Sequence, residues 1–133
     1  MAIELEMVLR LLLAAALGAI IGYQRERAGK PAGLRTHILI CVGAALFTVA
    51  SAYGFGVGAD PSRIAAGIVA GIGFLGAGAI IRGEGGIVEG LTTAATIWSV
   101  AAIGLATGAG LYIVAAVTTA VILIVLFLPR ATR

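Results

Sequence analysis

The sequence predicts an all-α integral membrane protein, a single-domain bundle of five transmembrane helices over residues 1–133. Hydrophobic residues make up 61% of the chain and charged residues 11%, and the mean hydropathy is +1.14. A soluble domain carries roughly 25% charged residues, so these few charges could not cover a soluble surface. Five apolar runs are long enough to cross a bilayer, and 20 glycines suit closely packed membrane helices.

The five predicted spans follow one another with short connections. Each is close to the roughly 20 mainly apolar residues that a helix needs to cross the hydrocarbon core. The runs do not alternate apolar and polar residues with a period of two, so they are not strands of a barrel. The expected spans are residues 5–23, 36–55, 62–81, 91–107 and 111–128.

The first span has acidic residues at its start. Glu4 and Glu6 precede Arg10, whereas a cleaved secretory signal begins with a positively charged region. Arg10 lies one turn after Glu6, so we expect the two to pair, or the Arg10 side chain to reach outward to the interface. Gly18 and Gly22 form a small-xxx-small pair, which favours a close helix contact.

The second span begins with a polar turn after a basic loop. Arg35, Thr36 and His37 lie where the apolar helix begins. We interpret His37, the only histidine, as an interfacial hydrogen-bonding side chain, with a pH-sensitive site as the alternative. Cys41 is the only cysteine and lies in an apolar run, so we expect a small buried side chain and no internal disulfide.

The third span begins with a capping signal and is rich in glycine. Asp60 is expected to cap the helix with Pro61 in its first turn; a ligand role for Asp60 is the alternative. Residues 71–76 match GxGxxG, but no strand precedes them and they lie in mid-membrane, which excludes a dinucleotide site. We instead expect this helix at the centre of the bundle, with a hinge or pore lining as the alternative. The glycines expected to pack helices together are Gly18, Gly22, Gly67, Gly71, Gly73, Gly76, Gly78, Gly104 and Gly108.

The fourth span repeats features of the second. GLRT at residues 33–36 and GLTT at residues 90–93 open the two helices. The first two pairs of spans are therefore interpreted as two parallel copies of one hairpin, as found in some transporter folds. Lys and Arg concentrate in the loop 24–35, in the loop after the third span and after Pro129, which places the N-terminus outside and the C-terminus in the cytoplasm. The basic pI of about 9.6 is thus a topology signal, and nucleic-acid binding is not expected.

Polar residues gather at the predicted cytoplasmic ends of the spans and form the candidate functional site. We call this set the polar zone; its members are Glu26, Arg35, Thr36, His37, Arg82, Glu84, Thr92, Thr93 and Thr96. Helix capping and headgroup contact are the alternative interpretation. No span carries an Asp or Glu at its middle, although Mg²⁺ prefers hard oxygen ligands. No nucleophile, base and orienting residue occur together, so we expect no enzyme activity and no cofactor, while a metal site stays open.

Four stretches carry a family resemblance. They are AGLRTH (residues 32–37), DPSRIA (60–65), GIGFLGAG (71–78) and GLTTAAT (90–96). In order and spacing they resemble the MgtC/SapB family of membrane proteins over nearly the whole chain. The resemblance implies a multi-pass protein of the bacterial inner membrane. It also implies links to magnesium homeostasis, to growth at low Mg²⁺ and to virulence, and regulation of other membrane proteins, with ATP synthase as one partner.

The sequence departs from the family pattern at three positions. Gln24 replaces an acid found in many members, and Gly67 and Ala70 replace polar residues. Some members also carry a soluble C-terminal domain, and regulation through that domain is not expected for this chain. Our first hypothesis is an inner-membrane regulatory or interaction protein linked to Mg²⁺ limitation and to stress or virulence adaptation. The alternative is a channel or transporter for Mg²⁺ or another small ion or solute. Expected partners are membrane lipid, further copies of the chain and other membrane proteins.

Overall fold

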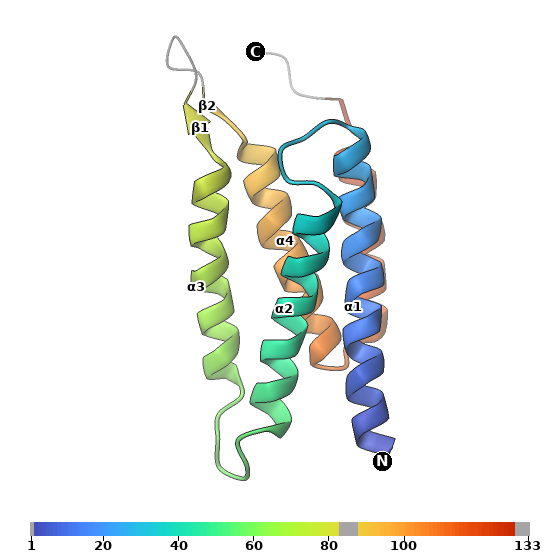
Figure 1. Cartoon of the computed structure of the whole chain (residues 1–133), viewed down its shortest axis with the longest axis vertical. Coiled ribbons are helices and arrows are strands. Elements are labelled where there is room, and N and C mark those ends of the chain that lie inside the picture. The colour runs from blue at the N-terminus through green and yellow to red at the C-terminus, as the bar shows by residue number, and fades with distance from the viewer. Residues whose placement is uncertain (1, 83–87, 130–133) are drawn as a thin grey trace.

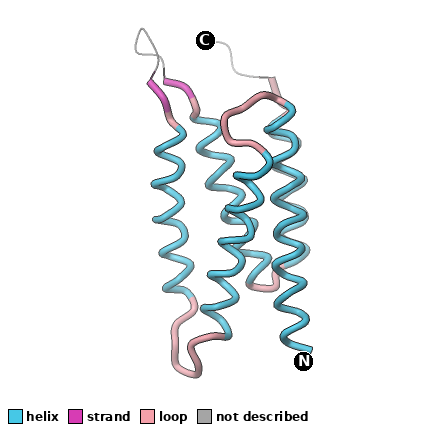
Figure 2. The backbone as a smooth tube through the Cα atoms, in the orientation of Figure 1, coloured by secondary structure: helices cyan, strands magenta, loops and turns pink. Residues whose placement is uncertain are grey.

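Five helices lie side by side in the computed structural model, which describes residues 2–82 and 88–129 (Figure 1). They are α1 (Ala2–Arg27), α2 (Leu34–Tyr53), α3 (Ser62–Ala79), α4 (Leu91–Gly108) and α5 (Tyr112–Leu126). Successive helices run in opposite directions, so α1 begins at one end of the bundle and α5 ends at the other (Figure 1). Strands β1 (Ile81–Arg82) and β2 (Val88–Glu89) form a short antiparallel pair between α3 and α4 (Figure 2). The predicted all-α helical class is confirmed.

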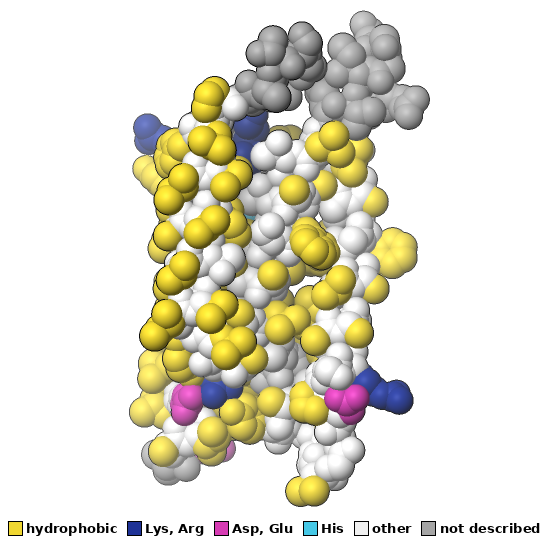
Figure 3. Space-filling view, turned by 180° about the vertical axis from the view of Figure 1, so that it is seen from behind, with side chains coloured by type: hydrophobic (Ala, Val, Ile, Leu, Met, Phe, Trp, Pro, Cys, Tyr) yellow, Lys and Arg dark blue, Asp and Glu magenta, His cyan; other side chains and the backbone are white. Residues whose placement is uncertain are grey.

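The surface of the bundle suits a membrane. Helices α1 to α4 are each long and apolar enough to cross a bilayer, whereas α5 is apolar but has 15 residues. Hydrophobic side chains cover the length of the bundle, and charged side chains lie near its two ends (Figure 3). In a soluble protein an apolar surface of this extent would be a liability, whereas in a bilayer it faces lipid tails. Which end faces the cytoplasm stays a prediction from the charge distribution.

The core lies where α1, α2 and α4 pack against one another. A Cβ atom built on Gly18 of α1 would lie 2.8 Å from the backbone carbonyl oxygen of His37, so the backbones of α1 and α2 touch. A Cβ atom on Gly104 of α4 would collide with the carbonyl oxygen of Cys41, so α4 also touches the backbone of α2, next to α1. Ala14 and Ala45 are fully buried at these contacts. Small residues therefore allow the close helix approach that membrane bundles use in place of a solvent-driven core.

Helix α3 lies at the edge of the bundle, and the expectation that it occupies the centre is wrong (Figure 1). Only Gly76 among its five glycines has a neighbour, with the Ala94 carbonyl oxygen 3.6 Å from the position of an added Cβ atom. The remaining four have nothing within 4 Å of that position; they are Gly67, Gly71, Gly73 and Gly78. The central place belongs to α4, which is the most buried of the four long helices and packs against α1, α2, α3 and α5.

Asp60 binds the first residue of α3 from the preceding loop. One carboxylate oxygen, Oδ1, accepts hydrogen bonds from the Ser62 backbone N–H at 3.0 Å and from the Ser62 hydroxyl at 2.7 Å. The helix begins at Ser62 with Pro61 in the N-cap position, so Asp60 acts from one residue further out than the sequence predicted. Because both hydrogen bonds favour the ionised carboxylate, they lower the pKa of Asp60 from its usual value of 3.8.

The lowered pKa predicts how this helix start responds to acid. The two hydrogen bonds are present above the unfolded-state pKa and are lost as the pH falls through the lower folded-state pKa. We expect the amide resonance of Ser62, followed by NMR in detergent micelles, to titrate with a midpoint below 3.8. The Asp60→Asn variant has no carboxylate and should show no such transition. A wild-type midpoint at or above the usual value would contradict the prediction.

Candidate functional site

Arg25 turns inward from the last turn of α1. Its side chain is 3% exposed, and its Nη2 atom donates a hydrogen bond to Thr93 Oγ1 of α4 at 3.1 Å. The Nε atom of Arg25 is buried without a hydrogen-bond partner among the described residues. The sequence pattern predicts this arginine only as a charge of the loop 24–35. Its spacing from Gly18 and Gly22 contained the missing signal, because residues i, i+4 and i+7 share one helix face.

His37 is fully buried on the first turns of α2. Its Nδ1 atom lies 2.8 Å from the Gly33 carbonyl oxygen, which only a protonated nitrogen can serve, so Nδ1–H is the donor. The second ring nitrogen, Nε2, is buried and has no hydrogen-bond partner within residues 2–82 and 88–129. Gly22 of α1 makes room for this ring, because a Cβ atom there would lie 3.1 Å from the His37 Cβ atom.

The structure divides the polar zone into a buried part and an exposed part. Thr93 and Thr96 are 3% and 4% exposed, and Thr96 Oγ1 donates to the Thr92 carbonyl oxygen at 2.7 Å. With Arg25 and His37 they form what we call the buried polar cluster. Four other members of the zone are exposed: Glu26, Arg35, Thr36 and Thr92. The Arg82 side chain and the whole of Glu84 lie outside the described residues.

Glu26 has a defined structural task at the same end. Its Oε1 atom accepts a hydrogen bond from the Leu34 backbone N–H at 2.9 Å. Leu34 is the first residue of α2, so this contact satisfies one of the free N–H groups of that helix start. The carboxylate therefore serves the α1–α2 connection.

A second buried arginine lies at the opposite end of the bundle. Arg10 is 6% exposed and donates to the Gly108 carbonyl oxygen at 2.8 Å, to the Tyr112 hydroxyl at 2.8 Å and to the Glu6 carboxylate at 2.7 Å. The expected pairing with Glu6 is thus confirmed, and the guanidinium points inward. Tyr112 also donates to Glu6 at 2.8 Å. Through these contacts Arg10 links α1, α4 and α5 at this end of the bundle.

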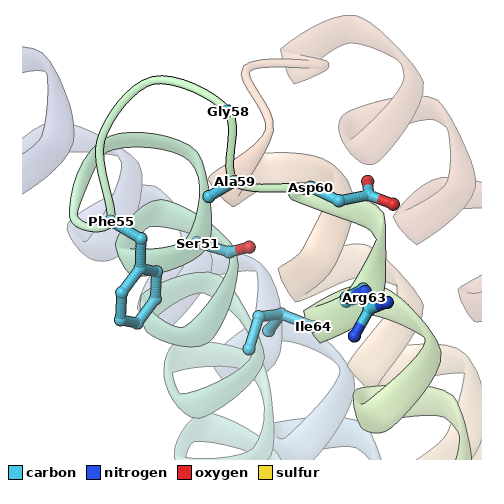
Figure 4. A pocket seen from close by; sticks show the side chains of 7 residues that line it. All are labelled: Ser51, Phe55, Gly58, Ala59, Asp60, Arg63 and Ile64. Carbon is cyan, nitrogen blue, oxygen red and sulfur yellow. The ribbon is translucent and has the colours of Figure 1, made fainter.

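At the end of the bundle that holds Arg10, the connection between α2 and α3 borders an open hollow of about 520 Å³ (Figure 4). Its lining residues are Ser51, Phe55, Gly58, Ala59, Asp60, Arg63 and Ile64. The Ser51 hydroxyl donates to the Pro61 carbonyl oxygen at 3.1 Å, and Asp60 is bound to Ser62. Ser51 therefore holds the loop against α2, and Asp60 holds it to the start of α3.

The charges inside the bundle limit the chemistry that its interior can perform. The buried ionised side chains of the described chain are those of Arg10 and Arg25, and both are cationic. Within residues 2–82 and 88–129, no group of three His, Cys, Asp or Glu side chains is placed to hold a metal ion. The interior therefore offers hydrogen-bond donors and positive charge, which suit an anion or a structural role and repel a divalent cation.

The helices, their apolar surface and the charged ends define a multi-pass membrane protein. Residues 11–133 match the family model described as the MgtC family. The chain belongs to the MgtC family. No solved structure matches it.

Curated relatives come from several bacteria. "Putative magnesium transporter YhiD" of Escherichia coli K12 is 54% identical over 114 residues, covering 80% of this chain and 53% of the relative. "Protein SapB" of Bacillus subtilis is 43% identical over 139 residues, covering 98% and 60%. "Protein MgtC" of Brucella abortus is 52% identical over 109 residues, covering 82% and 45%. The chain thus spans about half the length of the curated relatives it matches.

The Arg25–Thr93 hydrogen bond predicts a selective loss of stability. Thr93→Val keeps the side-chain shape but removes the oxygen that accepts from the buried guanidinium. We expect the free energy of unfolding, measured by denaturation in mixed micelles, to fall by about 1.5–3 kcal/mol. Thr92→Val is the matched control: this neighbour is exposed, so its effect should stay within about 0.5 kcal/mol. Equal losses in the two variants would contradict the assigned contact.

Proposed function

We propose that this protein is a regulatory or interaction protein of the bacterial inner membrane. It acts on other membrane proteins during Mg²⁺ limitation and in stress or virulence adaptation. The observation that carries the proposal is the cationic interior described above. Arg10 links helices at one end of the bundle and Arg25 lies inside the other, and both are buried. Buried guanidinium groups repel a divalent cation, so a role without Mg²⁺ passage fits the interior better.

The edge helix α3 offers the surface for contact with another membrane protein. At about 3.6 residues per turn, Gly67, Gly71 and Gly78 share one face of α3, opposite Gly76, which faces α4. Phe74 lies on the same face and is 81% exposed. We call this the α3 outer face. Small residues let a second membrane helix approach closely, and Phe74 provides an apolar side chain to fill the space. This pattern supports association with a second copy or with another membrane helix.

The family resemblance indicates the conditions and the partner for the proposed role. It points to Mg²⁺ limitation, and one relative carries magnesium in its name. It also points to ATP synthase as a membrane partner. Partner capture through the α3 outer face is what the regulatory proposal requires, because α3 is the least buried of the four long helices.

Substitution of the α3 outer face tests the proposal. In Gly67→Leu/Gly71→Leu, two bulky side chains would block close helix approach. Gly73→Leu is the control, because Gly73 is also open but lies on a different face of α3. We expect cross-linking in native membranes to lose self-association and partner products, ATP synthase included, only in the double variant, with thermal stability unchanged. Unchanged products, or equal loss in the control, would overturn the proposed contact surface.

A transporter for Mg²⁺ or another small ion or solute is the second candidate, favoured by the printed name of the Escherichia coli relative. Purified protein in liposomes, with a membrane potential applied, separates the two candidates. Under the regulatory proposal, Mg²⁺ uptake should equal that of empty liposomes. Mg²⁺ uptake by wild type would overturn the regulatory proposal. If Arg25→Gln changes this uptake and Arg35→Ala does not, the transport path runs along the buried polar cluster.

A further inference from the structure

A groove separates α1 from α5 at the end of the bundle where both helices finish. Its volume is about 840 Å³, and it opens to the side of the bundle. The residues that line it are Ala19, Ile20, Tyr23, Gln24, Arg27 and Ala28 from α1 and its end, and Leu123 and Phe127 from α5 and its end. This is the same end of the bundle as the polar zone, but the groove lies outside the buried polar cluster.

The chemistry of the groove changes along its length. Its inner part is apolar, with Ile20 of α1 facing the groove together with Leu123 of α5. Its outer part is polar and cationic, because Tyr23, Gln24 and Arg27 lie one turn nearer the end of α1. The Arg27 guanidinium lies 5.9 Å from the centre of the Tyr23 ring, a cation–π contact that holds it beside the groove. A ligand that fits must be apolar at one end and anionic at the other.

Gln24 adds a hydrogen-bond acceptor to the polar part. Its amide oxygen is buried and has no hydrogen-bond partner among the described residues. A buried polar atom without a partner is costly, and a donor from a bound ligand would satisfy it. A headgroup that carries both a phosphate and hydroxyl donors matches the pair formed by Arg27 and Gln24.

The charge around the groove mouth has the matching sign. Arg27 lines the groove and Lys30 follows three residues later, while the neighbouring acid, Glu26, is bound to the Leu34 backbone N–H. Basic pockets between membrane helices attract the headgroups of anionic lipids. A zwitterionic headgroup carries a positive group that these cationic side chains repel, so it would bind more weakly.

We propose that this groove binds one anionic phospholipid with a hydroxyl-bearing headgroup, of the phosphatidylglycerol class. The lipid phosphate pairs with Arg27, and a headgroup hydroxyl donates to the Gln24 amide oxygen. One acyl chain lies along Ile20 and Leu123, with Phe127 beside it. The lipid then fills the space between α1 and α5 that the two helices leave open.

Lipid retention by native mass spectrometry tests this site. Purified wild-type protein in neutral detergent is titrated separately with phosphatidylglycerol and with phosphatidylcholine of the same acyl chains. We expect preferential retention of one phosphatidylglycerol, and a roughly fivefold weaker preference in Arg27→Gln, since one basic residue near an anionic surface contributes about that factor. Arg35→Gln is the matched control, because Arg35 is an exposed cation at the same end outside the groove.

Two further measurements keep the proposal falsifiable. Ala19→Phe would fill the apolar part of the groove without changing any charge, and it should lower retention of phosphatidylglycerol while the thermal stability of the lipid-free protein is maintained. Glycerol phosphate at millimolar concentration should not displace the lipid, because it lacks acyl chains. Equal retention of both lipids by wild type, equal loss in Arg35→Gln, or displacement by glycerol phosphate would each overturn the assigned lipid site.

Discussion

Arg10→Leu is expected to lower the free energy of unfolding by about 3 kcal/mol, close to the cost of breaking a buried charge interaction. The side chain donates to three groups on three parts of the bundle, and each loses its donor in the variant. Glu6 is 46% exposed, so water solvates part of its charge after the change. The loss should therefore lie at the lower end of the range for buried ion pairs.

The expected effect of Arg10 has a specific source at the end of α4. The last carbonyl groups of a helix lack intrahelical partners and carry the negative end of the helix dipole. Gly108 is the last residue of α4, and its carbonyl oxygen accepts from Arg10 at 2.8 Å. The guanidinium also lies 5.4 Å from the centre of the Tyr53 ring and 5.8 Å from that of Tyr112. One cation thus serves the ends of α2 and α4 and the start of α5.

Arg63 provides the control for this prediction. It lies at the start of α3, at the same end of the bundle, and is exposed. Chemical denaturation in mixed micelles should show a change within about 0.5 kcal/mol for Arg63→Leu and an intermediate loss for Arg10→Lys. Lysine keeps the charge but lacks the planar guanidinium that reaches several acceptors at once. A similar loss in Arg10→Leu and Arg63→Leu would show that the contacts of Arg10 do not stabilise the fold.

Hydropathy was sufficient to place the helices along the chain. Each expected span overlaps one helix, because an apolar run of membrane length can satisfy its backbone groups only as a helix. The boundaries moved where polar residues extend a helix beyond the apolar run. Helix α1 thus starts at Ala2 and continues to Arg27, whereas α5 ends at Leu126, two residues before the expected end of its span. The two-residue strands β1 and β2 were not expected.

The arrangement of the helices across the bundle was not predictable from the same pattern. Glycine content suggested a central α3, but a glycine only permits close approach and does not select the neighbour. Gly18 and Gly104 meet the backbone of α2, whereas Gly67 and Gly71 meet nothing within 4 Å in the described chain. Which faces pair depends on contacts between residues far apart in the sequence.

The candidate site was predicted in part. His37, Thr93 and Thr96 are buried at one end of the bundle, where the polar zone was expected. Arg25 was missed because a basic residue at the end of an apolar run was counted towards orientation. Its position three residues after Gly22, on the face that packs against α2, distinguishes it from Arg27, which lies at the groove beside α5. Helical spacing relative to a packing glycine is therefore the better guide to such arginines.

Gly104→Ala is the second change for which we expect a large effect, a loss of about 3 kcal/mol in the free energy of unfolding. The added methyl group would collide with the Cys41 carbonyl oxygen and lie 3.0 Å from the Ala44 Cβ atom. The obstacle is the backbone of α2, which no side-chain rotation can remove. Overpacking a close contact typically costs about 1–3 kcal/mol, and a collision with main chain belongs at the upper end of that range.

Gly73→Ala makes the comparison specific to packing. The same methyl group is added to a membrane helix, but nothing lies within 4 Å of its position at Gly73. Since alanine restricts the unfolded chain more than glycine does, this variant should gain up to about 1 kcal/mol. Mixed-micelle denaturation should therefore move the two variants in opposite directions from wild type. A loss in both would mean that glycine is needed for helix flexibility, and no loss in Gly104→Ala would mean that α2 and α4 do not touch there.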